Sequence, residues 1–499
     1  MRRMRTLPGV LATLAALALG TTARAAPPRK GIDLAPCQLS PPGYGAQRVA
    51  ARCGTLEVPL VEPAPGEAIP AGARTLTLRV AVAGAEGSPA PDAVFVLAGG
   101  PGQAATEVYP QLAKAFQRIQ RKRDLVLVDQ RGTGGSGKLE CPEVPQPAVG
   151  RPLSPEEQRK VVGACAAALA KRTDLDAYDT VTFVRDLERV RAALGYEKVS
   201  LVGFSYGTRA AQVYAREFPD RVRALVLDGV APMSMKIGDT FEPDGQAAIE
   251  KLLARCAAEP GCQARFPDLR KDVEGLLARL AAAPVKVEVR DALTNEPKGR
   301  TFGADELRQV LFSFAYTGET VALLPPLVHA AAGGDFAPLA GAVQIVSGDI
   351  ETTIARAMQL SVICREDIPF YEKAPPAGGG WFGSKVRDQF LNLCASWPVK
   401  PVDDAVFRRV VKIQAPALLM SGEADPVTPP RWAELAAQDL PRAKHLVLPG
   451  QGHGVFFRGC MPRVAAAFLE AGTADGLDTG CLERVRAAPP FLDAQGGSP

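Results

Sequence analysis

Residues 199–208 have the sequence VSLVGFSYGT, and this stretch decides the fold. Its first four residues are typical of a short buried strand, and a helical pattern follows from Thr208 to Glu217. Ser205 lies between the two, with one glycine two residues before it and another two residues after it. A sharp strand-to-helix turn lifts such a serine into a cleft, and small flanking residues avoid clashes there. The stretch predicts a nucleophilic Ser205, with an ordinary glycine-rich turn as the alternative.

Similar apolar runs occur on both sides of this stretch. They are residues 93–97 (AVFVL), 125–128 (LVLV), 224–227 (ALVL), 417–420 (ALLM) and 446–448 (LVL). Helical patterns separate them; in residues 181–194, for example, apolar side chains recur every three or four positions and Gly195 follows. Strands that alternate with helices predict the α/β class, with a doubly wound, mostly parallel sheet.

The strand signal fades between residues 231 and 402. Segments 249–256, 269–282, 304–314 and 324–332 have amphipathic helical patterns instead. Because this block stands between two strand-rich stretches, we expect a helical cap inserted above the sheet. The predicted organisation is a signal peptide (1–25), a first part of the core (26–230), the cap (231–402) and a second part of the core (403–499). The loop at 374–383 (APPAGGGWFG) is either a mobile rim over a pocket or a plain surface linker.

The first 25 residues have the features of a secretory signal peptide. Arginines at positions 2, 3 and 5 precede an apolar run at 10–19, and alanines at 23 and 25 form a cleavage site. The run is too short to span a bilayer as a helix, so we expect no stable membrane insertion after cleavage. Cleavage removes four arginines from a chain with a net charge of +4, so nucleic acid is not an expected partner.

Ten cysteines agree with an exported, periplasmic or secreted protein, because disulfides form in oxidising compartments. Pairing in chain order is the simplest prediction. It gives Cys37–Cys53, Cys141–Cys165, Cys256–Cys262, Cys364–Cys394 and Cys460–Cys481.

Few residues are candidates for the catalytic base, since the chain has only three histidines, His329, His445 and His453. A serine hydroxyl needs a base within hydrogen-bond reach whose pKa is near neutral. His329 stands in a helical stretch of the predicted cap. His445 precedes the run LVL, at the wrong end for a site built at the carboxyl ends of parallel strands. His453 directly follows that run and is the predicted base.

Asp425 follows the run ALLM and is the predicted acid. A carboxylate there can accept the second ring N–H of His453 and stabilise the imidazolium. The chain order Ser, Asp, His is the one expected for this kind of fold. Glu423 and Asp228 are the alternative acids. The alternative role for Asp425 is an N-cap of a helix that begins near Pro429.

The oxyanion of an acyl-transfer intermediate needs two backbone donors. One is the N–H of Tyr206, the residue after the nucleophile. The second is expected from GGPG at 99–102, with Gly100 as the candidate and Gln103 at the entrance, or this is a Gly-Pro turn without a ligand. The chemistry requires no cofactor. The absence of a Cys-x-x-Cys pair argues against a zinc site.

Five motifs together resemble the prolyl aminopeptidase and tripeptidyl aminopeptidase group of α/β-hydrolases. They are AGGPGQ (98–103), DQRGTGGSG (129–137), GFSYGT (203–208), GEADPVTP (422–429) and GQGHG (450–454). The resemblance extends from about residue 50 to residue 470 and implies the α/β-hydrolase fold with a helical cap. Ala98 departs from the pattern, because the family usually has histidine there, and any contact made by that histidine is absent.

The resemblance also implies a substrate, because members of this family remove residues from peptide N-termini. A carboxylate in the cap typically binds the free α-amino group, and Glu366 and Asp367 stand in the matching segment. They are predicted to pair with the amine of a peptide substrate. The alternative is a surface charge cluster with Arg365.

These expectations combine into an exported serine aminopeptidase that releases tripeptides or single, proline-type residues through an acyl-enzyme intermediate. A carboxylic-ester hydrolase with the same triad is the alternative, because fold and triad do not set the substrate. A hydrolase fold used only for binding is a third hypothesis, against which the complete triad argues.

Overall fold

The structure, a computed structural model, describes residues 31–41, 47–63, 67, 69–142, 144, 153–290, 294–342, 353–493 and 495–497. Its centre is a nine-stranded sheet with the order β1-β2-β3-β5-β4-β6-β7-β10-β11. The strands are β1 (Ala35–Leu39), β2 (Val49–Pro59), β3 (Thr75–Ala83), β4 (Ala93–Leu97), β5 (Leu125–Val128), β6 (Val199–Phe204), β7 (Val222–Asp228), β10 (Ala417–Gly422) and β11 (Ala443–Leu448).

The six strands predicted from apolar runs are all present and pair in parallel, from β5 through β4, β6, β7 and β10 to β11. The predicted α/β class with a mostly parallel sheet is therefore confirmed. The sequence analysis missed β1, β2 and β3, which add an antiparallel edge. β2 alternates between half-buried and exposed residues, so it lacks the continuous apolar run of a strand that is buried on both faces.

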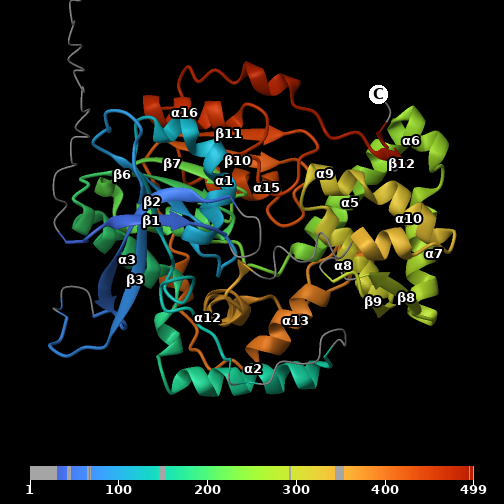
Figure 1. The fold of residues 1–499 in the computed structure, drawn as a ribbon, viewed down its shortest axis with the longest axis horizontal. Coiled ribbons are helices and arrows are strands. Elements are labelled where there is room, and N and C mark those ends of the chain that lie inside the picture. Colours follow the sequence, from blue (N-terminus) through green and yellow to red (C-terminus); the bar gives the residue numbers. More distant parts are fainter. Residues whose placement is uncertain are drawn as a thin grey trace, which may run out of the picture.

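Helices cover both faces of the sheet (Figure 1). α1 (Ala105–Gln120) and α16 (Met461–Ala471) pack on one face, where Phe116 shares a buried cluster with Val94 and Val96 of β4. α3 (Thr180–Leu194), α4 (Tyr206–Glu217) and α15 (Pro430–Ala437) pack on the other, where Tyr214 shares a cluster with Phe95. Successive residues of β4 thus serve opposite faces, which explains its wholly apolar sequence.

The segment between β7 and β10 is mainly helical, and we call its residues 231–402 the cap. Its helices are α5 (Phe241–Ala258), α6 (Pro260–Arg265), α7 (Leu269–Ala282), α8 (Ala304–Phe314), α9 (Gly318–Ala322), α10 (Leu324–Ala332), α12 (Arg356–Glu366) and α13 (Lys385–Cys394), and α14 (Asp404–Phe407) follows it. α7, α8 and α10 have the predicted bounds. The sequence analysis missed a hairpin of β8 (Val285–Arg290) and β9 (Pro297–Phe302), although Val and charged residues alternate in β8.

Two further arrangements were not predicted. α2 (Pro155–Ala170) comes from the first part of the chain but lies beside α13 (Figure 1), and its Leu169 shares a buried cluster with Met358 and Trp397. Most of the loop at 374–383 is exposed, but Phe382 near its end is buried in the core of the cap, so the loop is anchored there and is more than a plain surface linker. The short elements are η1 (Leu175–Ala177), η2 (Pro219–Arg221), η3 (Ile368–Phe370), η4 (Gly380–Phe382), η5 (Gly480–Arg484), β12 (Phe491–Asp493) and β13 (Gly496–Gly497).

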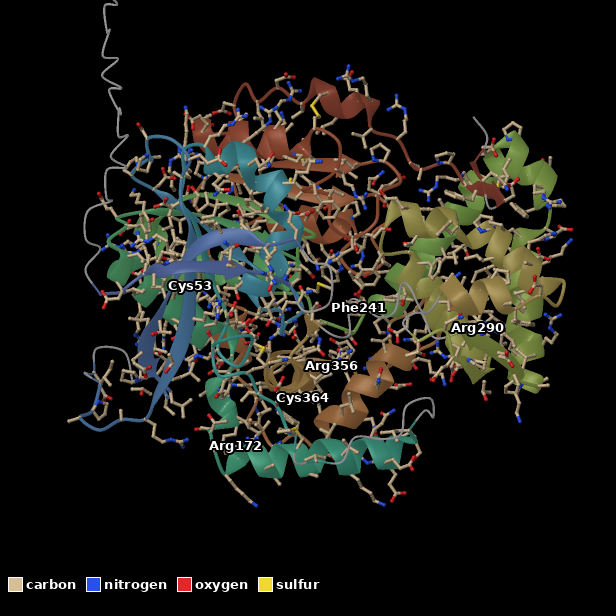
Figure 2. All side chains as sticks on the ribbon, viewed as in Figure 1. Cys53, Arg172, Phe241, Arg290, Arg356 and Cys364 are labelled. Atoms are coloured by element: carbon tan, nitrogen blue, oxygen red, sulfur yellow. A yellow bond between two sulfur atoms is a disulfide. The ribbon has the colours of Figure 1, made fainter. Side chains whose placement is uncertain are left out.

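All five predicted disulfides are confirmed. They join Cys37–Cys53, Cys141–Cys165, Cys256–Cys262, Cys364–Cys394 and Cys460–Cys481, and no cysteine is free. Figure 2 labels Cys53 on β2 and Cys364 on α12. The predicted signal peptide lies outside the described residues. Within the described part of the chain, no helix combines the length and apolar character needed to cross a bilayer.

Candidate active site

Ser205 occupies the turn between β6 and α4 with a φ angle of 53°, a conformation rare for a residue with a side chain. The flanking glycines have a steric cause. A Cβ on Gly203 would lie 2.5 Å from the carbonyl oxygen of Gly207, and a Cβ on Gly207 would lie 2.3 Å from the carbonyl oxygen of Leu97. The turn therefore accepts no side chain at either position. Strain of this kind, held by the surrounding packing, is typical of a nucleophile turn.

His453 and Asp425 meet at the same edge of the sheet, in the loops after β11 and β10. The Nδ1 atom of His453 lies 2.8 Å from Oδ2 of Asp425 and 3.0 Å from the hydroxyl oxygen of Thr428. The ring packs over Gly229, where a Cβ would lie 2.9 Å from its Cε1 atom. Gly229 follows Asp228, whose carbonyl oxygen accepts the N–H of Ser205 at 2.8 Å. The backbone of Ser205 and the imidazole of His453 are thus both placed against the segment 228–229.

Asp425 uses its two oxygens for different partners. Oδ1 accepts the backbone N–H groups of Val427 and Thr428 at 2.9 and 2.8 Å, and Oδ2 accepts the Thr428 hydroxyl at 2.8 Å and faces His453. The helix nearby begins at Pro430 with Pro429 as its N-cap, so the alternative helix-capping role for Asp425 is wrong. A turn-stabilising role and contact with the imidazole coexist, because the backbone N–H groups of the turn use Oδ1 and leave Oδ2 to face both the Thr428 hydroxyl and His453.

The alternative acids and bases have other partners. A carboxylate oxygen of Glu423 accepts the N–H of Gly450 at 2.8 Å. Nε2 of His445 lies 2.9 Å from the hydroxyl of Ser421, and Nδ1 of His329 lies 2.8 Å from Asp272 in the cap.

The charges at this edge stabilise one another. Burial raises the pKa of Asp425, but the nearby His453 and two backbone N–H groups outweigh it, so the pKa lies below its usual value. Burial lowers the pKa of His453, but Asp425 and then Asp228 outweigh it, so the pKa lies above its usual value. The pair therefore favours a protonated imidazole beside an ionised carboxylate, the state that a base reaches after it accepts a proton.

The glycine-rich loop after β4 faces the serine. A Cβ on Gly99 would lie 3.1 Å from Cβ of Ser205, so the backbone that leads into Gly100 approaches the serine closely. Tyr206 is the first residue of α4, where backbone N–H groups lack helical partners. The carbonyl oxygen of Gly102 accepts the N–H of Ala355 at 2.9 Å, and the Gln103 amide donates to Thr353 at 3.3 Å. The cap thus contacts this loop directly.

The motif DQRGTGGSG supports the same loop. Asp129 is fully buried and accepts the N–H and the hydroxyl of Thr106, both at 2.9 Å, at the start of α1. The Gln130 amide donates to the hydroxyl of Tyr206 at 3.1 Å. The motif therefore connects the start of α1 with the residue that follows the serine.

The sequence analysis missed two residues that contact His453. The hydroxyl of Thr428 lies within hydrogen-bond distance of its ring, and the GEADPVTP motif contained the signal. The carbonyl oxygen of Tyr316 in the cap accepts the backbone N–H of His453 at 2.7 Å, and the two rings meet edge to face at 5.6 Å. No sequence pattern marked Tyr316, because its position depends on how the cap packs.

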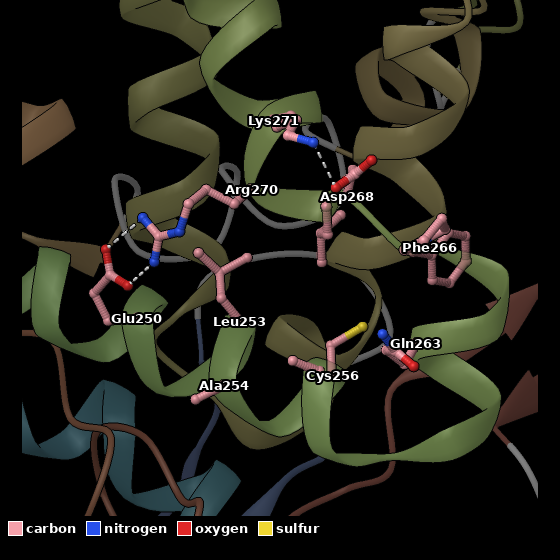
Figure 3. Close-up of a pocket in the computed structure, with 12 residues that line it drawn as sticks. Glu250, Leu253, Ala254, Cys256, Gln263, Phe266, Asp268, Arg270 and Lys271 are labelled. Carbon is pink, nitrogen blue, oxygen red and sulfur yellow. Dashed lines mark hydrogen bonds and ion pairs between the residues drawn. The ribbon is translucent and has the colours of Figure 1, made fainter.

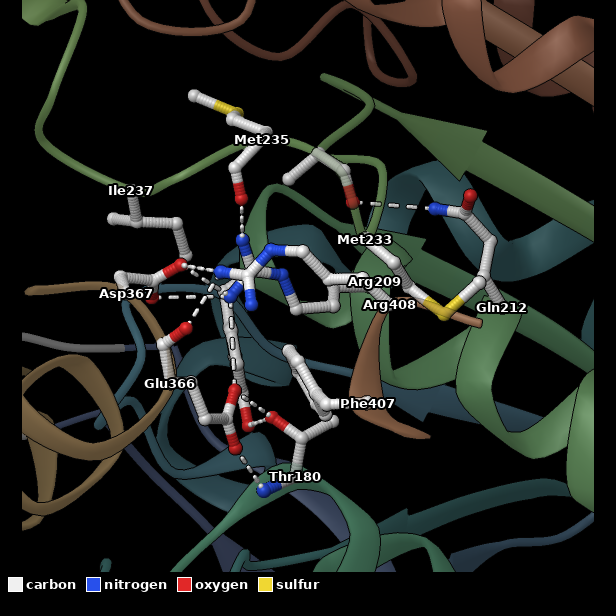
Figure 4. Close-up of polar contacts among 12 residues, drawn as sticks. Thr180, Arg209, Gln212, Met233, Met235, Ile237, Glu366, Asp367, Phe407 and Arg408 are labelled. Atoms are coloured by element: carbon white, nitrogen blue, oxygen red, sulfur yellow. Dashed lines mark hydrogen bonds and ion pairs between the residues drawn. The ribbon is translucent and has the colours of Figure 1, made fainter. Parts of the chain in front are cut away.

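Glu366 and Asp367 are completely buried, and their carboxylate oxygens accept hydrogen bonds from other protein groups (Figure 4). The two oxygens of Asp367 accept from the Arg209 guanidinium at 3.0 and 3.1 Å, and Glu366 accepts the N–H and hydroxyl of Thr180 at 2.6 and 2.7 Å. Thr180 also lies 2.8 Å from the hydroxyl of Tyr206. Burial raises the pKa of Glu366 to about 8, although Arg209 opposes it.

This placement corrects two sequence-based expectations. The two carboxylates do not form a surface cluster with Arg365, which pairs instead with Asp176 and Asp179. They also lack an exposed oxygen for a substrate amine, so the predicted role of Glu366 and Asp367 as amine anchors is not supported. Their contacts instead join α12 of the cap to α3 and α4 of the core.

Replacing Arg209 by methionine is expected to lower the free energy of unfolding by about 3–5 kcal/mol, because it removes the guanidinium that lies 3.0 Å from Asp367 and 3.6 Å from Glu366. Arg408 remains, 3.5 Å from Asp367. The loss should be larger at pH 9 than at pH 6, since Glu366, whose pKa is raised to about 8, is protonated at the lower pH and needs a cation less there. Denaturant unfolding at both pH values measures this. Lys122→Met is the control, because Lys122 forms an exposed ion pair with Glu470 worth at most about 1 kcal/mol. Equal effects of both substitutions would contradict the structural role.

A hollow of about 360 Å³ lies in the cap between α5, α6 and the start of α7 (Figure 3). Its lining includes Leu253, Phe266 and the ion pair of Glu250 with Arg270, and none of the predicted site residues. It is therefore separate from the candidate active site. In the described residues, no group of three or more His, Cys, Asp or Glu side chains is placed to hold a metal ion.

Comparison of the sequence with known proteins identifies hydrolase families. Residues 92–256 match the alpha/beta hydrolase fold family, and residues 379–481 match the TAP-like protein family. The chain is 30% identical to "Serine protease Hip1" of Mycobacterium tuberculosis, over 93% of this chain and 95% of that one. It is 26% identical to "Tripeptidyl aminopeptidase" of Streptomyces lividans, over 77% of this chain and 73% of that one.

Among solved structures, the proline iminopeptidase of Mycobacterium smegmatis matches 80% of this chain and 95% of its own, with 15% identity and a TM-score of 0.41. The chain belongs to the TAP-like α/β-hydrolase family and is a serine hydrolase of the peptidase type.

Proposed function

We propose that this protein is an exported serine aminopeptidase in which Ser205 is the nucleophile, His453 the base and Asp425 the residue that orients the base. The observation that carries the proposal is the 2.8 Å contact between Nδ1 of His453 and Asp425, beside a serine held at a φ of 53°. Because Nδ1 is engaged by the carboxylate, Nε2 is the ring atom left to accept the serine proton.

The reaction then has two stages. The Ser205 oxygen attacks the scissile carbonyl carbon while His453 takes the hydroxyl proton, and the N–H groups of Tyr206 and Gly100 stabilise the oxyanion. The intermediate collapses, the C–N bond breaks, and His453 returns the proton to the leaving amine. A water molecule attacks the resulting acyl-serine ester by the same route and releases the N-terminal fragment.

The substrate proposal is a peptide with a free N-terminus, cut to release a tripeptide or a single residue. It is supported by the relatives named tripeptidyl aminopeptidase and probable proline iminopeptidase. Export is supported by the five disulfides, since structural disulfides persist in oxidising compartments, and by the signal-like first 25 residues.

Aminoacyl and tripeptidyl nitroanilides with a free amine are expected to be cleaved with a kcat/KM about 10–100-fold above that of their N-acetylated forms. The expected size is that of one charge-assisted hydrogen bond to the amine, about 1.5–3 kcal/mol, with about 1.4 kcal/mol for each factor of ten. Because Glu366 and Asp367 are buried, its acceptor is proposed to be another group near Ser205. Chromogenic assays measure the rates, and mass spectrometry of the released fragment distinguishes one residue from three. Nitrophenyl esters of simple acids serve as the comparison.

Turnover of the esters alone would replace the peptidase by the ester hydrolase. Equal cleavage of free and acetylated amides would remove amine recognition but keep the peptidase.

A further inference from the structure

Asp228 lies at the end of β7, between the strands that lead to the other site residues. It pairs with Phe204 of β6, the residue before Ser205, and with Met420 of β10, which leads to the Asp425 loop. Its carbonyl oxygen accepts the backbone N–H of Ser205 at 2.8 Å. The backbone of Asp228 is therefore part of the support that holds the serine in its strained conformation.

The side chain of Asp228 reaches the loop of the base. Both carboxylate oxygens lie 2.9 Å from the backbone nitrogen of Val455, and Oδ2 also accepts the N–H of Phe456 at 2.9 Å. These residues follow His453 by two and three positions. One residue thus holds the serine through its main chain and the histidine loop through its side chain.

The carboxylate is in a costly environment. Asp228 is 1% exposed, and burial raises its pKa to about 6, although the two backbone N–H groups and His453 oppose this and Asp425 adds to it. No cation pairs with it among the described residues. Burying a carboxylate whose hydrogen-bond donors are all neutral lowers the stability of the fold. Such a group is therefore unusual unless it has a specific task.

A direct role as the triad acid is excluded by the contacts. Nδ1 of His453 faces Asp425 and Thr428, whereas the Asp228 oxygens accept from backbone groups beyond the ring. Gly229 is equally restricted, because a Cβ there would lie 2.9 Å from the His453 ring. The segment 228–229 therefore helps to fix the position of the ring. Gly229 packs against the ring, and the Asp228 carboxylate binds the loop that follows it.

We propose that Asp228 is a positioning residue that sets the separation of Ser205 and His453, because it binds the backbone of Ser205 and the loop that follows His453 at once. The proposal rests on the proposed roles of Ser205 and His453. Loss of its carboxylate releases the Val455 and Phe456 amides, and the histidine loop then shifts relative to the serine. A displacement of about 1 Å in a catalytic group can cost about 100-fold in rate.

The test compares Asp228→Asn and Asp228→Ala with wild type, using a free-amine peptide nitroanilide. Each preparation is first titrated to completion with a fluorophosphonate, so that kcat refers to competent sites and unfolded protein is not counted. We expect kcat per titrated site to fall about 10-fold in Asp228→Asn and about 100-fold in Asp228→Ala, with KM within about threefold of wild type. Asparagine keeps the side-chain volume and one acceptor oxygen, so it partly rescues the function.

Asp92→Asn is the matched control. Asp92 is also buried, but it lies at the opposite end of the sheet and pairs with Arg123 at 2.9 Å. Wild-type kcat per titrated site in both Asp228 variants would overturn the inference, as would an equal loss in the control or an effect on KM alone. If Asp228→Ala yields no titratable sites, Asp228→Asn decides. Failure of the proposed function is recognised separately, by persistent turnover in Ser205→Ala.

Discussion

Replacing Ser205 by alanine is expected to lower kcat by about 10⁴–10⁶-fold, the range seen when the nucleophile of a serine triad is removed. The acyl-enzyme cannot form without the hydroxyl, and only substrate binding and the oxyanion donors still contribute. The strained turn itself should persist, because the glycine contacts and the Ser205 N–H to Asp228 hydrogen bond do not involve the side chain. Peptide turnover and labelling by a fluorophosphonate probe measure the loss.

Ser200→Ala is the matched control for this experiment. Ser200 lies five residues earlier, on β6, is buried, and contacts Asp92 at 3.4 Å, at the end of the sheet away from the site. It should keep wild-type kcat and full probe labelling. Turnover and labelling that survive in Ser205→Ala would assign the nucleophile to another residue.

Replacing Asp425 by asparagine is expected to lower kcat by about 10⁴-fold, the size of effect seen for an asparagine at this position of a triad. The amide does not stabilise the imidazolium, and its NH₂ group favours the wrong tautomer of His453. The acid limb of the pH–rate profile should also move to lower pH. The reason is that the Asp425 carboxylate helps hold the His453 pKa above its usual value, so its loss lets the ring stay neutral in more acidic solution.

Glu423→Gln separates this effect from a general change in the loop. Glu423 stands two residues before Asp425. Its carboxylate accepts the backbone N–H of Gly450, in the loop that carries His453. A glutamine keeps an acceptor oxygen there, so kcat and the acid limb should stay close to wild type. A larger loss in Glu423→Gln than in Asp425→Asn would reverse the assignment of the acid.

Local sequence was sufficient to predict features whose conformation is set within one short segment. The turn at Ser205 requires glycine at 203 and 207 for purely steric reasons, so the pentapeptide predicted the conformation that the structure has. The buried strands were predicted for a similar reason, because a strand covered on both faces is apolar throughout. β1 and β2 are largely half-buried or exposed, and β3 is buried mainly in its second half, so none of the three is a continuous apolar run and all were missed.

Contacts between distant segments could not be predicted in the same way. Glu366 and Asp367 form an acidic pair by sequence, and only the packing of α12 against α4 places Arg209 beside Asp367 and makes both carboxylates inaccessible. Tyr316 reaches His453 because the cap folds back over the sheet. Neither contact leaves a periodic or compositional signal in the chain.

The sequence by itself therefore predicted the six parallel strands, the disulfide pairing in chain order and the identity of Ser205, Asp425 and His453 as candidates. Each of these follows from local sterics, apolar patterning, short chain loops or the scarcity of a residue type. The tertiary structure alone decided the burial of Glu366 and Asp367, the reach of the cap to the histidine, and the position of Asp228 between serine and histidine. Those features depend on residues up to 228 positions apart, and the free energy of such contacts is set by geometry that no single segment contains.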